Sequence, residues 1–126
     1  MEEYIRLFIK NMGVDSVEDI KDLYQDYMYE CNQLVMEIDT AFKDQFLDHS
    51  YVEKIVHNLK GVSANLYVHD VYENASKLDD ALLNGDSNSY TFQEILNLWH
   101  QTHLAYNASK NKIVHYFKQH GYTLTS

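Results

Sequence analysis

Proline is absent from this chain of 126 residues, and glycine occurs only four times. Tight turns and β-hairpins depend on these two residues, because proline presets the backbone of a turn and glycine adopts positive φ without strain. An all-β fold needs such turns at regular intervals along the chain, so it is disfavoured. Long helices joined by few connections are the alternative that this composition favours.

Cysteine and long apolar segments are also scarce. The single cysteine, Cys31, cannot form an internal disulfide, which favours a reducing compartment. No segment approaches the roughly 18 consecutive apolar residues of a membrane-spanning helix. The first residues, MEEYIRLFIKNMG, lack the basic and then apolar layout of a signal peptide. We therefore expect a cytoplasmic protein that makes no contact with a membrane.

Basic residues are few relative to acidic ones. Ten lysines and arginines stand against nineteen aspartates and glutamates, so the formal net charge is −9 at pH 7. This charge repels the phosphates of nucleic acids and anionic lipids, so neither is an expected partner. Hydrophobic residues make up 45% of the chain, which is enough for one folded core. We expect a single domain over residues 1–126.

Helix signals recur along the chain. A short first helix is expected over residues 2–12, ending at Gly13. Ser16, followed three residues later by Asp19, is close to a capping box and opens a helix predicted to run to about Phe46. Further helix starts are indicated at Ser50–Glu53 and Thr91–Glu94, and further helix ends at Asn84–Gly85 and Gly121.

The predicted helices are amphipathic and are joined by short polar connections. In the second helix, apolar residues recur every three or four positions, and Tyr106 in the last helix has the same core spacing. The second-helix stripe consists of Val17, Ile20, Tyr24, Tyr27, Cys31, Leu34, Ile38 and Phe42. Short connections place successive helices side by side in opposite directions. The sequence therefore predicts an all-α protein, an antiparallel up-down four-helix bundle with a short additional N-terminal helix.

The segment HNLKGVSANL, residues 57–66, carries a glycine inside a predicted helix. Glycine there costs up to about 1 kcal/mol relative to alanine, so its presence needs a reason. On a helical wheel, His57 lies roughly 140° from the middle of the apolar face and is therefore expected at the surface. Its helical neighbours on that side are Glu53, Lys60, Gly61 and Ala64. Gly61 and Ala64 would leave a smooth surface for another molecule to approach the imidazole.

This pattern suits nucleophilic chemistry on phosphorus. An unperturbed imidazole has a pKa of about 6.5, so it is mostly neutral near pH 7 and has a nitrogen lone pair available. Lys60, one turn away, disfavours the imidazolium form and can neutralise a phosphoryl group attached to the ring. We therefore interpret His57 as a phosphoryl acceptor and Lys60 as its electrostatic partner.

The same residues resemble a known family, the histidine-containing phosphotransfer (HPt) domains of two-component phosphorelays. The positions that match its His-x-Leu-Lys-Gly motif and the aliphatic residue after it are His57, Leu59, Lys60, Gly61 and Leu66. The positions similar to its downstream Ala-x-x-Leu-Glu and Gly-Asp pattern are Ala75, Leu78, Asp79, Gly85 and Asp86. The resemblance covers about residues 15–120.

The resemblance implies a phosphocarrier rather than an enzyme. His57 would be the phosphoacceptor and would exchange a phosphoryl group with the phospho-aspartate of receiver domains. Lys60 would contact that group, Gly61 would allow close approach, and Glu53 and Ala64 would border the partner surface. The expected partners are response-regulator receiver domains and a hybrid sensor histidine kinase, bound to a monomer of this chain. No cofactor is expected in this chain, because Mg²⁺ would lie in the partner receiver domain.

Two alternatives remain open. The family usually has glycine after the aliphatic residue, and this chain has Tyr67. That departure favours a pseudo-HPt module, which docks on a receiver or kinase and regulates it without transferring phosphate. The other alternative is a metal- or ligand-binding helical bundle. His100 and His103 are three residues apart, but no Glu-x-x-His motif accompanies them, so no metal site is expected, and His103 is predicted to be in the core or partly buried.

Overall fold

The computed structural model describes residues 2–13, 16–44, 46–84 and 90–126, and these residues form helices and their connections. The helices are α1 (Glu2–Met12), α2 (Val17–Phe42), α3 (His49–Asn65), α4 (His69–Leu83) and α5 (Phe92–Gln119). No strand occurs in the four described ranges, so the prediction of an all-α protein is confirmed.

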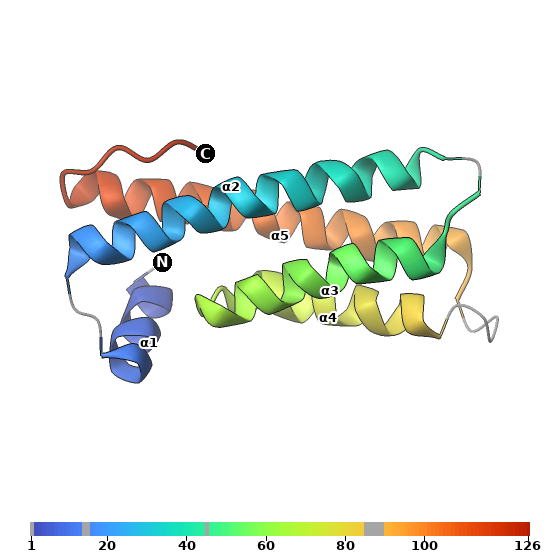
Figure 1. Ribbon diagram of the computed structural model, residues 1–126, viewed down its shortest axis with the longest axis horizontal. Coiled ribbons are helices and arrows are strands. Elements are labelled where there is room, and N and C mark those ends of the chain that lie inside the picture. The colour runs from blue at the N-terminus through green and yellow to red at the C-terminus, as the bar shows by residue number, and fades with distance from the viewer. Residues whose placement is uncertain (1, 14–15, 45, 85–89) are drawn as a thin grey trace.

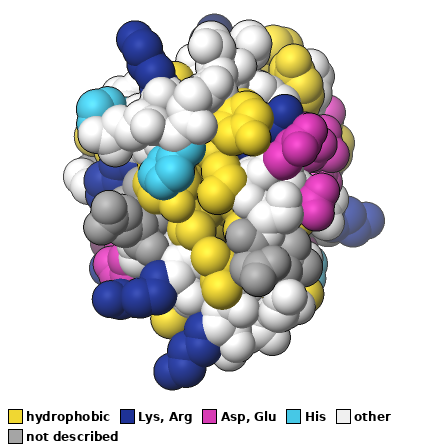
Figure 2. Space-filling view, turned by 90° about the vertical axis from the view of Figure 1, so that its left-hand side faces the viewer, with side chains coloured by type: hydrophobic (Ala, Val, Ile, Leu, Met, Phe, Trp, Pro, Cys, Tyr) yellow, Lys and Arg dark blue, Asp and Glu magenta, His cyan; other side chains and the backbone are white. Residues whose placement is uncertain are grey.

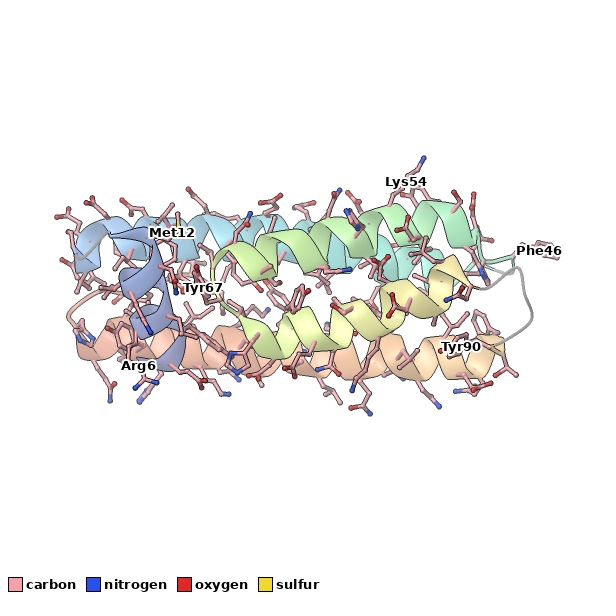
Figure 3. All side chains as sticks on the ribbon, turned by 90° about the horizontal axis from the view of Figure 1, so that it is seen from below. Arg6, Met12, Phe46, Lys54, Tyr67 and Tyr90 are labelled. Atoms are coloured by element: carbon pink, nitrogen blue, oxygen red, sulfur yellow. The ribbon has the colours of Figure 1, made fainter. Side chains whose placement is uncertain are left out.

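The four longer helices lie side by side, and each runs in the opposite direction to the one before it (Figure 1). α3 packs against α2 and α4, and α5 packs against α4 and α2, so the four helices enclose a shared core. α1 lies across the end of this assembly where α2 begins and α5 ends (Figures 1 and 3). None of the described helices combines the length and the apolar character needed to cross a membrane.

Capping side chains mark the beginnings of α3 and α5, whereas Ser16 takes the predicted cap position of α2 without a side-chain hydrogen bond. The Thr91 hydroxyl accepts a hydrogen bond from the Glu94 amide at 3.1 Å, and the Glu94 carboxylate accepts one from the Thr91 amide at 3.0 Å. This confirms the predicted capping box of α5. The predicted box at Ser50 is wrong. Asp48 caps α3 instead, because its carboxylate accepts a hydrogen bond from the Tyr51 amide at 3.1 Å.

Helix ends differ from the prediction by at most a few residues. α2 ends at Phe42 instead of near Phe46, because the next two amides bond carbonyls three residues back and tighten the last turn. Asn84 caps the end of α4 as predicted, whereas Gly85 lies outside the described residues. Gly121 follows α5 with a φ of +87°, the left-handed conformation that ends many helices.

The predicted apolar stripe of α2 forms one wall of the core. Its buried members are Ile20, Tyr24, Tyr27, Cys31, Ile38 and Phe42. Val17 and Leu34 are only half-buried, and Met28 and Val35 are buried in addition. The buried face is broader than the predicted stripe because α2 packs against both α3 and α5.

The tyrosines predicted for the core are buried, and each hydroxyl group has a hydrogen-bond partner. The pairs are Tyr24 with the Leu66 carbonyl (2.6 Å), Tyr27 with the Ser63 hydroxyl (2.8 Å) and Tyr106 with the Asn32 side chain (2.7 Å). Partners are needed here because a buried hydroxyl without one loses the hydrogen bonds that water would give it. The two bonds from α2 end at the last turn of α3, so they hold in place the helix that carries His57.

α1 is attached to the other helices by its buried face and by hydrogen bonds of the Tyr4 hydroxyl to Asp70 of α4 and Ser109 of α5. A strip of hydrophobic side chains still reaches the surface at this end of the molecule (Figure 2). The Tyr4 hydroxyl donates to the Asp70 carboxylate of α4 at 2.7 Å, and burial raises the pKa of Tyr4 to about 12. Burial alone would raise the pKa of Asp70, but the Tyr4 hydrogen bond and the charges of His69 and Lys112 lower it.

Replacing Tyr4 with phenylalanine removes the hydrogen bonds to Asp70 and Ser109 without removing the ring. We expect the free energy of unfolding near pH 7 to fall by about 1–2 kcal/mol, as for a bond to a charged acceptor. A carboxylate with a lowered folded pKa contributes stability above its unfolded pKa and loses it as the pH falls through the folded value. The difference between Tyr4→Phe and the natural protein should therefore shrink toward about pH 3. Urea unfolding at both pH values measures it, and an equal loss at both would contradict the assignment.

Candidate functional site

His57 lies in the middle of α3 with 66% of its side chain exposed, which confirms the predicted surface position. α3 adopts this orientation because its apolar residues, spaced by three and four, pack against α2 and α4. The buried residues of α3 are Val52, Ile55, Val56, Leu59 and Ser63. The imidazole is therefore presented to solvent from a helix whose opposite face is anchored in the core.

A buried carboxylate from the neighbouring helix lies beside the histidine. Asp79 of α4 has only 3% of its side chain exposed. Its Oδ2 atom lies 3.6 Å from Nδ1 of His57 and 3.3 Å from Nζ of Lys60, which donates a hydrogen bond to it. Lys60 is itself three-quarters buried, with 26% of its side chain exposed. One carboxylate oxygen therefore lies beside both His57 and Lys60, the two residues that the sequence pattern predicts to accept a phosphoryl group and to neutralise it.

Glu53, one turn before His57, lies close to the His57 imidazole and to the Asp79 carboxylate. The ligand atoms of Glu53, His57 and Asp79, here called the His57 cluster, all lie within 4.8 Å of one another. Burial and the neighbouring Asp79 carboxylate raise the pKa of Glu53 above its usual value. Together with the Lys60 ammonium, two carboxylates therefore border one exposed imidazole.

The surface along α3 beyond His57 is open. Gly61 and Ala64 are both exposed, and a Cβ added to Gly61 would meet no described atom within 4 Å. The predicted outward position of Gly61 is therefore confirmed. Beside it, a shallow hollow of about 170 Å³ lies between α2 and α3. Its lining residues are Leu23, Asp26, Tyr27, Glu30, Val62, Asn65 and Leu66.

Asp79 was not predicted as a site residue, although the sequence contains a signal for it. It lies on the buried stripe of α4, which also contains Ala75, Leu78 and Leu82. A charged residue on such a stripe is almost always paired when fully buried, so it points to a specific partner on a neighbouring helix. The sequence pattern of α4 alone does not identify that partner as the pair Lys60 and His57.

Tyr67 occupies the position where glycine is usual in the HPt pattern, and its φ is +60°. It ends α3 in a Schellman motif, in which the Val68 amide bonds the Ser63 carbonyl at 3.0 Å and the Tyr67 amide bonds the Ala64 carbonyl at 3.2 Å. Figure 3 shows Tyr67 at this turn beside α1, where its ring meets Phe8 edge-on with centroids 6.3 Å apart. The backbone at this position therefore has the positive φ that glycine adopts without strain, although the residue is a tyrosine.

The two histidines weighed as metal ligands lie on α5 and are not part of the His57 cluster. His103 is partly buried, as predicted. Its ring stacks on Trp99 with centroids 5.2 Å apart, and its Nδ1 lies 3.7 Å from an Asp39 carboxylate oxygen. His100 is exposed. The contacts of His103 are those of a side chain that covers the edge of the core.

Comparisons with models of known protein families, with curated proteins and with solved structures give no match to this chain. The function must therefore be inferred from the residues around His57 themselves.

Two substitutions at Tyr67 separate backbone strain from ring packing. Tyr67→Gly and Tyr67→Ala both lose the contact with Phe8. The difference between their free energies of unfolding therefore measures the cost of the left-handed backbone at this position. We expect the glycine variant to be more stable than the alanine variant by about 0.5–1 kcal/mol, after the greater unfolded-state entropy of glycine is allowed for. Urea unfolding measures both. Gly121, which ends α5 in the same motif, is the control, because Gly121→Ala should lose a similar amount. Equal stability of the two Tyr67 variants would show that the turn is unstrained.

Proposed function

We propose that this protein is a phosphocarrier of the HPt type, which accepts a phosphoryl group on His57 and passes it on. The observation that carries the proposal is that one buried carboxylate oxygen, Oδ2 of Asp79, lies close to both Nδ1 of His57 and the Lys60 ammonium. The exposed imidazole and the open surface at Gly61 support the same chemistry. We also propose that α2 to α5 form an antiparallel up-down four-helix bundle of the HPt kind, with α1 as the additional helix.

In this proposal, Asp79 selects the nitrogen that attacks. A carboxylate beside Nδ1 favours the tautomer with the proton on Nδ1, so Nε2 keeps its lone pair. The 3.6 Å separation of Nδ1 from Oδ2 is slightly longer than a hydrogen bond, and a small rotation of the exposed ring is enough to close it. Nε2 is then the nucleophile.

The proposed transfer moves one phosphoryl group between two side chains. Nε2 forms a bond to phosphorus while the bond from phosphorus to the aspartyl oxygen of a receiver domain breaks, and that carboxylate leaves. The ring keeps its Nδ1 proton and becomes positively charged, and the adjacent Asp79 carboxylate stabilises this charge. Lys60 can turn from Asp79 toward the phosphoryl oxygens. Mg²⁺ bound by the receiver would neutralise the group in transit, so this chain contributes mainly positioning.

The proposed docking surface extends from His57 along α3 past Gly61 and Ala64. It continues into the hollow between α2 and α3, where Leu23 and Leu66 offer apolar contacts. A receiver domain seated there would bring its phospho-aspartate to the imidazole without meeting a side chain at Gly61. The proposed partners are thus receiver domains and a hybrid sensor histidine kinase, contacted by a monomer in the cytoplasm.

The first test is phosphoryl transfer from a phosphorylated receiver domain to this protein. We expect an acid-labile, alkali-stable label that disappears in His57→Gln, with a change in unfolding free energy within about 0.5 kcal/mol because the position is exposed. His115→Gln, which changes an exposed histidine on α5, should transfer normally. Receiver binding without labelling of the natural protein would contradict the carrier and support the docking-only pseudo-HPt alternative.

Lys60 is tested against Lys54, an exposed lysine on the same helix (Figure 3). We expect Lys60→Ala to slow transfer by about tenfold or more, because one charge on the developing phosphoryl group is lost. It should also lower stability by about 1–3 kcal/mol, because the buried Asp79 carboxylate loses its cation. Rates are therefore measured well below the midpoint of thermal unfolding. Equal rates for Lys60→Ala and Lys54→Ala would remove the assigned role.

Gly61 should show opposite effects on stability and binding. We expect Gly61→Ala to raise the free energy of unfolding by about 0.5–1 kcal/mol, because alanine is the better helix former and nothing crowds its Cβ. Gly61→Leu should weaken receiver binding by at least about tenfold, because its side chain projects into the proposed docking surface. Urea unfolding and calorimetric titration measure the two effects. Asn111→Leu on the exposed face of α5 is the matched control, and receiver binding undiminished in Gly61→Leu would refute the docking surface.

A further inference from the structure

The buried Asp79 carboxylate has one oxygen without a partner. Lys60 donates to Oδ2, but Oδ1 is fully buried and has no hydrogen-bond partner among the described residues. A buried carboxylate oxygen in this state loses its hydration without compensation, which is unusual in folded proteins. The side chain is 97% buried, as its 3% exposure shows, so bulk water does not supply the missing partner. A ligand at this point would relieve the cost.

The groups around the Asp79 carboxylate are those that bind transition metals. The ligand atoms of Glu53, His57 and Asp79 lie within 4.8 Å of one another. Atoms bound to one zinc ion are about 3–4 Å apart, because each bond is about 2 Å long. For one ion to bind all three groups, the distances between these ligand atoms must shorten by about 1 Å. This shortening is available through rotation of the exposed His57 ring and of the partly exposed Glu53 side chain, while the buried Asp79 stays in place.

We propose that Glu53, His57 through Nδ1, and Asp79 form a binding site for one divalent transition-metal ion, with zinc as the best match. One imidazole nitrogen and two carboxylates suit zinc, whereas Mg²⁺ and Ca²⁺ prefer oxygen ligands alone. Three protein ligands leave a fourth position for water. Two carboxylates balance the charge of the ion, so the Lys60 ammonium turns to solvent when the metal binds.

This metal site does not depend on the proposed phosphotransfer, but its proposed effect on His57 phosphorylation rests on that function. A metal on Nδ1 displaces the proton from that atom, and the neutral ring then carries its proton on Nε2. Nε2 is the atom that must attack phosphorus in the proposed function. Zinc binding and phosphorylation of His57 therefore exclude each other, and zinc acts as an inhibitor of the carrier.

Zinc binding is measured on the metal-free full chain near pH 7, by competition with a chromophoric chelator. We expect one zinc ion per chain with a Kd below about 100 μM, and binding at least about tenfold weaker in Glu53→Gln, His57→Gln and Asp79→Asn. His115→Gln should bind like the natural protein. Glu53 and His57 lie at the surface, so the test stands even where Asp79→Asn fails to fold. ¹⁵N NMR of the His57 ring should show zinc on Nδ1 and a proton on Nε2.

Several outcomes would overturn the site. A Kd weaker than about 100 μM would refute the metal site. Zinc on Nε2 of His57 would contradict the assigned geometry. Loss of binding in His49→Gln, with binding retained in His57→Gln, would move the metal to the beginning of α3, where His49 and Glu53 line a common cavity.

The inhibitory consequence is tested without a receiver, because a receiver binds metal itself. Phosphoramidate can phosphorylate an exposed imidazole directly, as its phosphorus–nitrogen bond breaks, ammonia leaves and Nε2 bonds phosphorus. We expect saturating zinc to lower the rate of His57 phosphorylation by at least about tenfold. An unchanged rate would refute the exclusion. Zinc binding in a chain that never accepts phosphate would refute the proposed function and leave the metal site standing.

Discussion

Oδ2 of Asp79 lies between the Lys60 ammonium and the His57 imidazole, at the contact between α3 and α4. A carboxylate this deeply buried stays charged only if a cation pairs with it, and Lys60 is the cation within reach. Two side chains of one helix can face a single group when they are three or four residues apart. The three-residue spacing of His57 and Lys60 on α3 therefore lets both side chains reach the same oxygen of Asp79. Asp79 belongs to α4, so the packing of α4 against α3 determines which groups surround His57.

Three features near His57 each reduce stability. A buried charge costs desolvation, Gly61 weakens the interior of a helix, and Tyr67 takes a backbone conformation that L-residues avoid. Packing requires neither Gly61 nor the charge of Asp79, since Gly61 has open space above it and an apolar residue would suit the stripe that contains Asp79. Local rules are broken in this way where function selects the residue. The concentration of such features on α3 and its contact with α4 supports a site there without reference to any family.

The sequence predicts what depends on neighbouring residues along the chain. The exposed position of His57 follows from the apolar period of its own helix, and the start of α5 follows from the Thr91 capping box. The position of Asp79 beside His57 depends on how α3 and α4 align, and no pattern within one helix determines that alignment. At the start of α3, Asp48 and Ser50 both suit a cap, and the stronger carboxylate acceptor takes the position two residues earlier. These two errors therefore concern a choice made between elements and a choice between competing caps.

The chemistry of the site depends on which positive group pairs with Asp79. In the structure that group is Lys60, and the imidazole lies within 4 Å of the same oxygen. Phosphorylation at Nε2 would charge the ring, so its Nδ1 proton could take over the pairing and release Lys60 to the phosphoryl oxygens. In the proposed metal site, the ion would take the place of the Lys60 ammonium beside Asp79 and would bind the imidazole as a ligand. Because a buried carboxylate must keep some cation beside it, the proposed transfer would couple movement of Lys60 to the charge on the ring, and Asp79 would link the state of His57 to the position of its lysine.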